Sequence, residues 1–163
     1  MKFEVMPTVT KFEDLEIWQI SFRLCKMIND FILKEPFSKD FGLRNQIDNS
    51  SGSIMDNIAE GFERGSRNEF INFLGFSKGS SGEVKSQLYR VLYRNYISQS
   101  EFDEAYNLAD LAGRKINKLI NYLNHSPYKG EKFKNREVHE PAENYSDEID
   151  FNVIINHFES LKS

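Results

Sequence analysis

The side chains that could bind a metal or act as nucleophiles are few and unfavourably spaced. The 163-residue sequence has three histidines, His125, His139 and His157, and one cysteine, Cys25. No histidine stands four residues from another on a helix, and there is no cysteine pair, so the spacing typical of a zinc site is missing. A single cysteine also excludes an intrachain disulfide. We therefore expect no metal or other cofactor, and we interpret Cys25 as an unreactive packed thiol.

The carboxylates are numerous, but their pattern does not indicate a catalytic pair. Asp56, Glu60 and Glu63 follow one another along a single helical segment, as is usual for a solvated helix face. A cleft that pairs Glu60 with Glu83 is the less favoured alternative. The chain also lacks a Gly-Lys-Ser/Thr phosphate-binding loop. We expect the protein not to be an enzyme.

A stretch that combines cations with aromatic rings is the best candidate for recognition. In residues 87–96, Arg90 and Arg94 lie one helical turn apart and beside a line of tyrosines. Cations next to flat rings can hold single-stranded nucleic acid by charge and stacking. The arginines that could contact RNA, DNA or a protein partner are Arg64, Arg67, Arg90 and Arg94. The alternative is that these arginines form salt bridges and subunit contacts.

The overall charge gives little support for a nucleic-acid role. The chain has 21 basic and 25 acidic residues, a net charge of −4, whereas proteins that bind phosphate backbones usually have a basic excess. No apolar run approaches the roughly 18 residues that span a bilayer, so we expect no membrane contact. The first residues, Met1 to Glu4, contain no apolar signal core, and this predicts a cytoplasmic protein.

Four long segments repeat apolar residues with the helical period, over about 14–34, 41–64, 67–96 and 101–123. Short connections favour antiparallel neighbours, so the sequence predicts an all-α, up-down-up-down four-helix bundle over residues 1–124. Ser66 with Glu69, and less clearly Ser100 with Asp103, have the spacing of helix-capping boxes. The inner stripe predicted for the first helix consists of Leu15, Trp18, Phe22, Cys25, Ile28 and Ile32, and that of the fourth of Phe102, Ala105, Ala109, Ala112, Ile116, Leu119 and Leu123.

Two helices have more apolar or side-chain-poor surface than one bundle needs. The first helix has a second apolar face, and the third has three glycines on one line, each of which costs about 1 kcal/mol relative to alanine. We therefore predict a homo-oligomer whose interface contains Ile17, Ile20, Leu24, Met27, Phe31, Gly75, Gly79, Gly82, Tyr89 and Tyr93. The alternatives are that the glycines relieve crowding within one subunit, or that the C-terminal segment covers them.

The chain changes character after the fourth helical segment. Residues 125–148 are polar, with mixed charges, and are predicted to form a linker. Residues 149–163 are apolar again, and one helical face groups Phe151, Ile154, Ile155 and Phe158. This short amphipathic segment either packs on its own bundle or recruits a partner.

Several short motifs occur in a familiar order. They are Phe12-Glu13-Asp14-Leu15, Gly42-Leu43-Arg44-Asn45-Gln46-Ile47, Asn57-Ile58-Ala59-Glu60-Gly61 and Glu69-Phe70. The set resembles the four-helix bundle family encoded in intervening sequences of bacterial ribosomal RNA genes, which includes the accessory variability protein of diversity-generating retroelements. The resemblance covers about residues 12–123.

The resemblance implies a small ring, typically a pentamer, with no known enzymatic activity. For the retroelement branch it implies binding to a reverse transcriptase and to RNA or DNA. We therefore expect a non-enzymatic, homo-oligomeric helical-bundle scaffold or adaptor, and the alternative is an accessory nucleic-acid-binding protein that partners a reverse transcriptase.

Overall fold

A computed structural model describes residues 9–125 of the chain. Its four long helices are α1 (Glu16–Ile32), α2 (Phe41–Glu63), α3 (Arg67–Tyr93) and α4 (Gln99–His125), and short 3-10 turns, η1 (Phe12–Asp14) and η2 (Phe37–Lys39), precede α1 and α2. The described part of the chain contains no strand. The predicted linker and C-terminal segment, with Phe151, Ile154, Ile155 and Phe158, lie outside the described residues.

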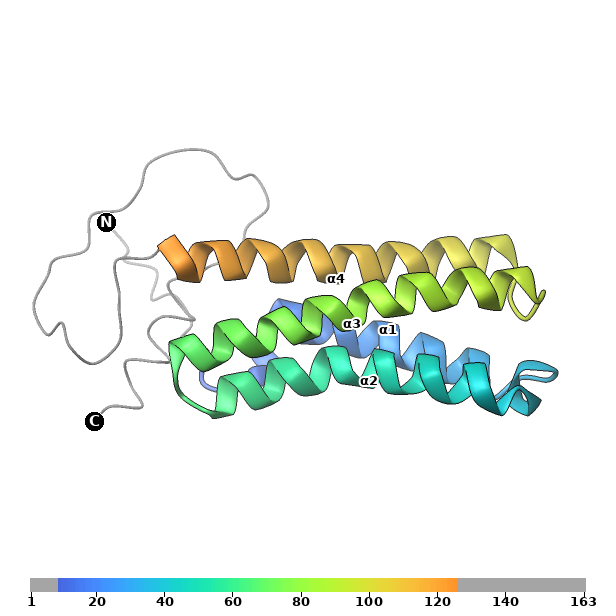
Figure 1. Cartoon of the computed structure of the whole chain (residues 1–163), viewed down its shortest axis with the longest axis horizontal. Helices are drawn as coiled ribbons and strands as arrows, with labels where there is room; N and C mark the ends of the chain where they lie inside the picture. The colour runs from blue at the N-terminus through green and yellow to red at the C-terminus, as the bar shows by residue number, and fades with distance from the viewer. Residues whose placement is uncertain (1–8, 126–163) are drawn as a thin grey trace, which may run out of the picture.

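The four helices lie lengthwise against one another in a single bundle (Figure 1). Each helix packs mainly on its neighbours in the sequence, and α1 also packs on α4, so that α1 and α3 occupy opposite corners. This arrangement confirms the predicted all-α four-helix bundle with up-down-up-down connections.

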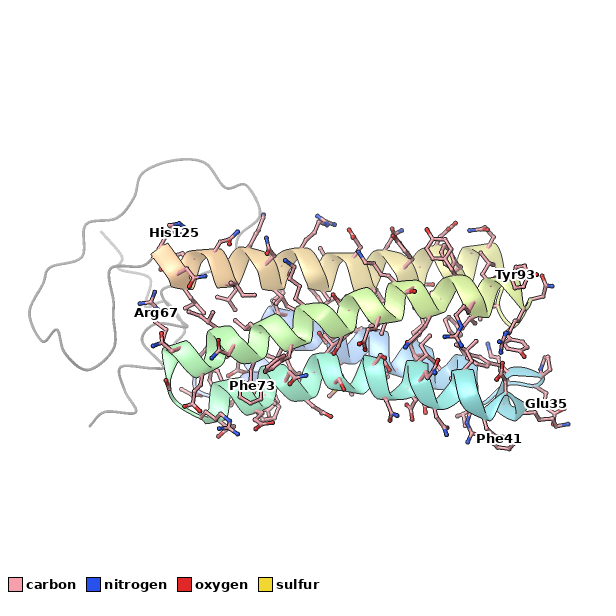
Figure 2. The ribbon with its side chains drawn as sticks, in the orientation of Figure 1. Glu35, Phe41, Arg67, Phe73, Tyr93 and His125 are labelled. Carbon is pink, nitrogen blue, oxygen red and sulfur yellow. The ribbon has the colours of Figure 1, made fainter. Side chains whose placement is uncertain are left out.

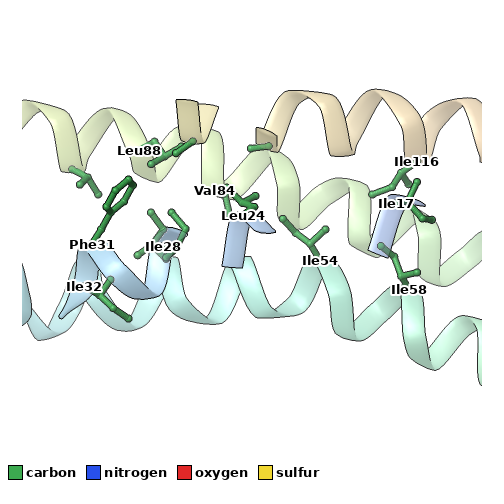
Figure 3. Close-up of a cluster of buried hydrophobic side chains, with 14 of the residues drawn as sticks. Ile17, Leu24, Ile28, Phe31, Ile32, Ile54, Ile58, Val84, Leu88 and Ile116 are labelled. Carbon is green, nitrogen blue, oxygen red and sulfur yellow. The ribbon is translucent and has the colours of Figure 1, made fainter. Parts of the chain in front are cut away.

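The core is a continuous row of aliphatic and aromatic side chains along the bundle axis (Figure 3). All seven residues of the stripe predicted for the fourth helix are buried, and so are Leu43, Ile47, Ile54, Ile58 and Phe62 of α2. Burial of such side chains contributes roughly 1.5–3 kcal/mol each. The three alanines of α4, at positions 105, 109 and 112, are completely buried and keep the middle of this helix slim.

The prediction for the faces of α1 was wrong. Ile17, Ile20, Leu24 and Phe31, which were assigned to a subunit interface, are at most 4% exposed within the single chain and belong to its own core. In contrast, Trp18 and Cys25 of the predicted inner stripe are only partly buried, and Phe22 is 43% exposed.

The reason for this exchange is the drift of the predicted stripe around the helix. Its residues recur on average every 3.4 positions, whereas the helix turns every 3.6. Leu15, just before the helix, is buried, but within the helix the stripe lies outside at Trp18 and reaches the core at Ile28 and Ile32, which are both buried. Met27, also assigned to the interface, is partly buried and lies on the side of α1 that faces Leu108 and Leu111 of α4.

Small residues let α3 lie close to both of its neighbours. A Cβ atom added to Gly61 of α2 would stand 2.6 Å from the Cβ of Phe73, and one added to Gly113 of α4 would stand 2.8 Å from the Oγ of Ser81. Between these points, the buried Ser77 hydroxyl donates to the carbonyl oxygen of Ile54 at 2.7 Å, which ties α3 directly to the backbone of α2.

The helix starts only partly match the predicted caps. Ser66 precedes α3 as expected, but its side chain makes no capping hydrogen bond, and Glu69 instead pairs with Arg64. The cap of α4 lies two residues before the predicted one: Glu101 accepts from the Ser98 backbone amide at 2.8 Å, and the Ser98 hydroxyl accepts from the Glu101 amide at 3.2 Å. This reciprocal pair is a capping box.

The close approach at Gly61 gives a direct test of the packing. We expect Gly61→Ala to lower the free energy of unfolding by about 1–3 kcal/mol, because Phe70 and Phe73 must move aside. The control is Gly52→Ala, also in α2, where the nearest atom to an added Cβ is 4.0 Å away. This control should gain up to about 1 kcal/mol in helix propensity. Urea denaturation of both variants checks the expectation, and equal effects would contradict it.

Candidate interaction surfaces

A line of small residues runs along the outward side of α3. We call the line Gly75, Gly79, Gly82 and Ser86 the α3 glycine line. A Cβ atom added to any of its three glycines would find no other atom within 4 Å, so these glycines do not relieve crowding inside the subunit. The line lies opposite the buried positions of α3, which include Leu74, Ser77, Ser81 and Val84. One of the alternatives left open by the sequence, intrasubunit crowding, is thereby removed.

Large aromatic side chains stand beside this line. Phe76 is 62% exposed, Tyr89 is 57% exposed, and Tyr93 is 86% exposed at the end of the bundle where α3 ends (Figure 2). The ring of Tyr89 contacts those of Phe102 and Tyr106 on α4, with centroids 5.0 and 5.7 Å away. Bare backbone bordered by exposed rings is a surface to which an aromatic or aliphatic partner can pack closely.

The outer side of α1 is aromatic and so complements the small residues of the α3 glycine line. Phe12, Trp18 and Phe22 form an α1 aromatic ladder, in which each centroid lies 5.3 Å from the next. The Lys26 ammonium lies 5.7 Å from the centroid of the Phe22 ring. Trp18 and Phe22 had been predicted for the inner stripe of this helix, so the outward aromatic face is a finding of the structure and not the surplus face predicted from the sequence.

Two of the four candidate arginines are held by carboxylates. Arg94 pairs with Asp40, which also accepts from the Tyr96 hydroxyl at 3.1 Å and from the Leu43 amide at 3.3 Å, so that it caps α2. Burial opposes ionisation of Asp40, but these hydrogen bonds outweigh it and lower its pKa below the ordinary value. Arg64 bridges two acids, Glu60 and Glu69.

The guanidinium of Arg64 lies 2.6 Å from Glu60 and 3.0 Å from Glu69, and it also covers the Phe73 ring. Hydrogen bonds to the two carboxylates raise the pKa of Arg64. Glu60 is thus a salt-bridge partner. Glu83, which sequence spacing allowed to pair with it, instead accepts from the Ser50 hydroxyl at 3.1 Å. The structure does not bring these two carboxylates together.

The other two arginines are also constrained. Arg90 donates to the Gln46 side-chain oxygen at 2.8 Å. Arg67 lies at the opposite end of the bundle, near His125 (Figure 2), and its buried Nε has no hydrogen-bond partner among residues 9–125. Burial lowers the pKa of Arg67. The four arginines therefore do not form one open basic patch.

A basic groove between α3 and α4 was not predicted from the sequence. We call it the α3/α4 groove; its cations are Lys78, Lys85, Arg114 and Lys118, and its other lining residues are Ser81, Gly82, Asp110, Gly113 and Asn117. Asp110 lies between Lys85, at 3.1 Å, and Arg114, at 2.8 Å, and these hydrogen bonds lower its pKa. The sequence signal was the spacing of Lys78 from Lys85 and of Arg114 from Lys118, which places each pair on one helix face.

Residues 9–125 contain neither a membrane-spanning helix nor a cluster of metal ligands. No helix between residues 9 and 125 is long and apolar enough to cross a membrane. The same range contains no group of three or more histidine, cysteine or carboxylate side chains arranged to hold a metal ion. Cys25 is partly buried between α1 and α2, and burial raises the pKa of its thiol.

Four helices with short connections and small-residue contacts make this a helical-bundle protein. Residues 13–118 match the model of the family described as 23S rRNA-intervening sequence protein, which is about two thirds of the chain. The chain therefore belongs to this family, as its motifs suggested. The comparison with curated proteins gave no match.

A solved structure supports the fold independently. It is that of a protein of unknown function from the S23 ribosomal protein family of Bacteroides thetaiotaomicron VPI-5482. It is 24% identical, with a TM-score of 0.58, and the alignment covers 64% of this chain and 97% of that chain. At this identity, the likeness shows the shared fold.

The Asp40 cluster predicts a specific pH dependence. Because folding lowers the pKa of Asp40 below about 3.8, its ionised form stabilises the fold above that pH, and this stabilisation is lost as the pH falls through the folded-state value. We expect Asp40→Asn to be less stable than the wild type at pH 7, by about 1 kcal/mol, with a smaller further loss on acidification below about pH 4.

Thermal unfolding followed by circular dichroism across this pH range measures the effect. Asp56→Asn, which changes an exposed carboxylate on the same helix, is the control and should follow the wild-type curve. If Asp40→Asn loses as much stability as the wild type on acidification, Asp40 does not contribute in this way.

Proposed function

We propose that this protein is a non-enzymatic scaffold that assembles into a homo-oligomer, in which the α3 glycine line of one copy receives the α1 aromatic ladder of the next. The observation that carries the proposal is the open space around Gly75 and Gly79; Gly82, the third glycine of the line, also lines the α3/α4 groove. Each glycine costs about 1 kcal/mol of helix propensity, and nothing within the described subunit makes use of their small size.

The two surfaces have complementary shapes. Phe22 protrudes from α1 and is 43% exposed, with the partly buried Trp18 beside it, while the α3 glycine line offers a flat strip at the level of the helix backbone. Small residues at a helix contact allow close approach, and buried aromatic side chains dominate the energy of most interfaces. Packing of the ladder on the line would remove both from water.

The positions of the two surfaces favour a ring. Because α1 and α3 occupy opposite corners of the bundle, the two faces point in different directions and cannot pair in an isologous dimer. A head-to-tail contact of this kind closes into a ring when the rotation between neighbours permits it. The family resemblance favours five subunits. In such a ring, a partner protein would meet the same surface repeated in every copy.

The pairing of the candidate arginines favours the scaffold over the accessory nucleic-acid-binding role with a reverse transcriptase. Arg64 and Arg94 already neutralise carboxylates of their own subunit, so binding to phosphate would have to replace these ion pairs. Arg90, in contrast, donates to a neutral side chain, that of Gln46.

Gly79→Arg tests the assembly. The arginine side chain has room in the isolated subunit but would stand between neighbouring copies, so we expect the molar mass in solution to fall to that of a monomer while the thermal stability of the bundle is kept. Multi-angle light scattering and circular dichroism measure the two quantities.

Gly52→Arg is the matched control, because it places the same side chain at an open glycine of α2, away from the proposed contact. It should keep the wild-type mass. A wild-type protein that is monomeric at micromolar concentration, or a Gly79→Arg variant that keeps the wild-type mass, would contradict the proposal.

The nucleic-acid alternative has its own test. We expect the full chain to leave a labelled single-stranded RNA unshifted in a gel at physiological salt, because its net charge is −4 and two candidate arginines are paired. A shift that Arg90→Glu abolishes, and that Lys26→Glu on α1 does not, would instead support the accessory role.

A further inference from the structure

We infer that the acidic C-terminal segment, residues 137–161, occupies the α3/α4 groove of its own subunit. This occupant is a segment of the same chain that follows α4, and the proposal does not depend on the assembly proposed above.

The α3/α4 groove has more basic than acidic side chains. Lys78, Lys85, Arg114 and Lys118 line it, and Asp110, which pairs with both Lys85 and Arg114, is the one acidic residue of the lining. Lys78 donates to the neutral Asn117 side chain at 2.8 Å. A net positive groove with a single acid favours an occupant with several carboxylates.

The floor of the groove allows a chain to come close. Ser81, Gly82 and Gly113 are small, and a Cβ atom added to Gly82 would find no atom within 4 Å. The cations stand on either side of this floor, Lys78 and Lys85 on α3 and Arg114 and Lys118 on α4. Carboxylates of a segment lying on the floor would therefore have cations on both sides.

The C-terminal segment has the matching composition. Residues 137–161 contain no lysine or arginine and seven acids, which are Glu137, Glu140, Glu143, Asp147, Glu148, Asp150 and Glu159. Six of the seven precede residue 151, and the apolar residues Phe151, Ile154, Ile155 and Phe158 follow them. The segment is thus acidic first and apolar second.

Along α4, the groove changes in the same order, from basic side chains to aromatic rings. A chain that turns back from His125 reaches Lys118 first, then Arg114 and Asp110, and finally Tyr106. The Lys85 ammonium lies 5.6 Å from the Tyr106 ring centroid, and Tyr106 contacts the exposed Tyr89. The acids would therefore meet the cations, and the apolar half would meet these exposed rings.

The length of chain is sufficient for docking on the same subunit. Residues 126–136 can span up to about 36 Å when extended, whereas Lys118 lies only about 10 Å from His125 along the helix axis. The apolar half would then end near Tyr89, at the border of the proposed subunit contact. Docking would neutralise the groove and keep it from binding other polyanions.

Zero-length crosslinking of the full chain tests the proposal. A water-soluble carbodiimide joins carboxylates to lysine amines that touch them, and peptide mass spectrometry locates the links. We expect links from Lys78, Lys85 and Lys118 to acids of residues 137–150. Their yield should fall when the salt is raised from 0.1 M to 1 M, because the screening length shortens from about 10 Å to about 3 Å.

A paired charge reversal makes the test specific. With Lys78→Glu and Arg114→Glu together, links from Lys85 and Lys118 should fall about tenfold, since the groove loses its positive charge. The control, Arg23→Glu with Lys26→Glu on α1, makes the same change of charge elsewhere and should keep the wild-type yield. Circular dichroism confirms that both variants are folded.

Isotope labelling identifies the source of the segment. When ¹⁵N-labelled and unlabelled chains are refolded together, links within one chain give only pure isotope pairs. Mixed pairs would place the segment of a second copy in the groove and overturn the proposal. Absence of links, or equal links to Lys26 and Lys34 on α1, would overturn it as well. None of these results depends on the molar mass, so failure here is distinct from failure of the proposed scaffold.

Discussion

The structure depends on the close approach of α3 to both of its neighbours. Gly61 and Gly113 remove side chains at the two contacts, and the Ser77 hydroxyl bonds directly to the backbone of α2. The core-facing side of α3 also buries large side chains such as Phe70 and Leu88. The small residues at its contact with α4 form the floor of the α3/α4 groove.

The charges of the bundle are arranged mainly to join helix ends to one another. Asp40 links the start of α2 to the end of α3 through Arg94 and Tyr96, and Arg64 links the end of α2 to the start of α3 through Glu69. These interactions use cations that, from the sequence alone, were equally suited to bind nucleic acid. A further group of cations lies between α3 and α4, around Asp110.

The fold could be predicted from the sequence because apolar spacing and connection length determine it, and the stripe of α4 was correct at every position. The core-facing side of α1 could not be predicted, since this helix has two apolar stripes. Only a strict period of 3.6 residues distinguishes the buried stripe of Leu24 from the outer stripe of Trp18. Ion pairs such as Arg94 with Asp40 join residues 54 positions apart, a distance over which no local pattern acts. A Cβ atom added to the glycines on the outer side of α3 would find no other atom within 4 Å, and their place in a subunit interface stays a prediction.

Cys25 offers a consequence of a different kind. Its sulfur lies 3.9 Å from the Ser51 hydroxyl at the contact of α1 with α2, it is the only thiol in the chain, and burial raises its pKa. The side of Cys25 that faces Ser51 becomes accessible to a maleimide or iodoacetamide when these two helices separate, and only the thiolate reacts. The alkylation rate of Cys25 therefore rises with the separation of α1 from α2, and it can be measured without introducing another cysteine.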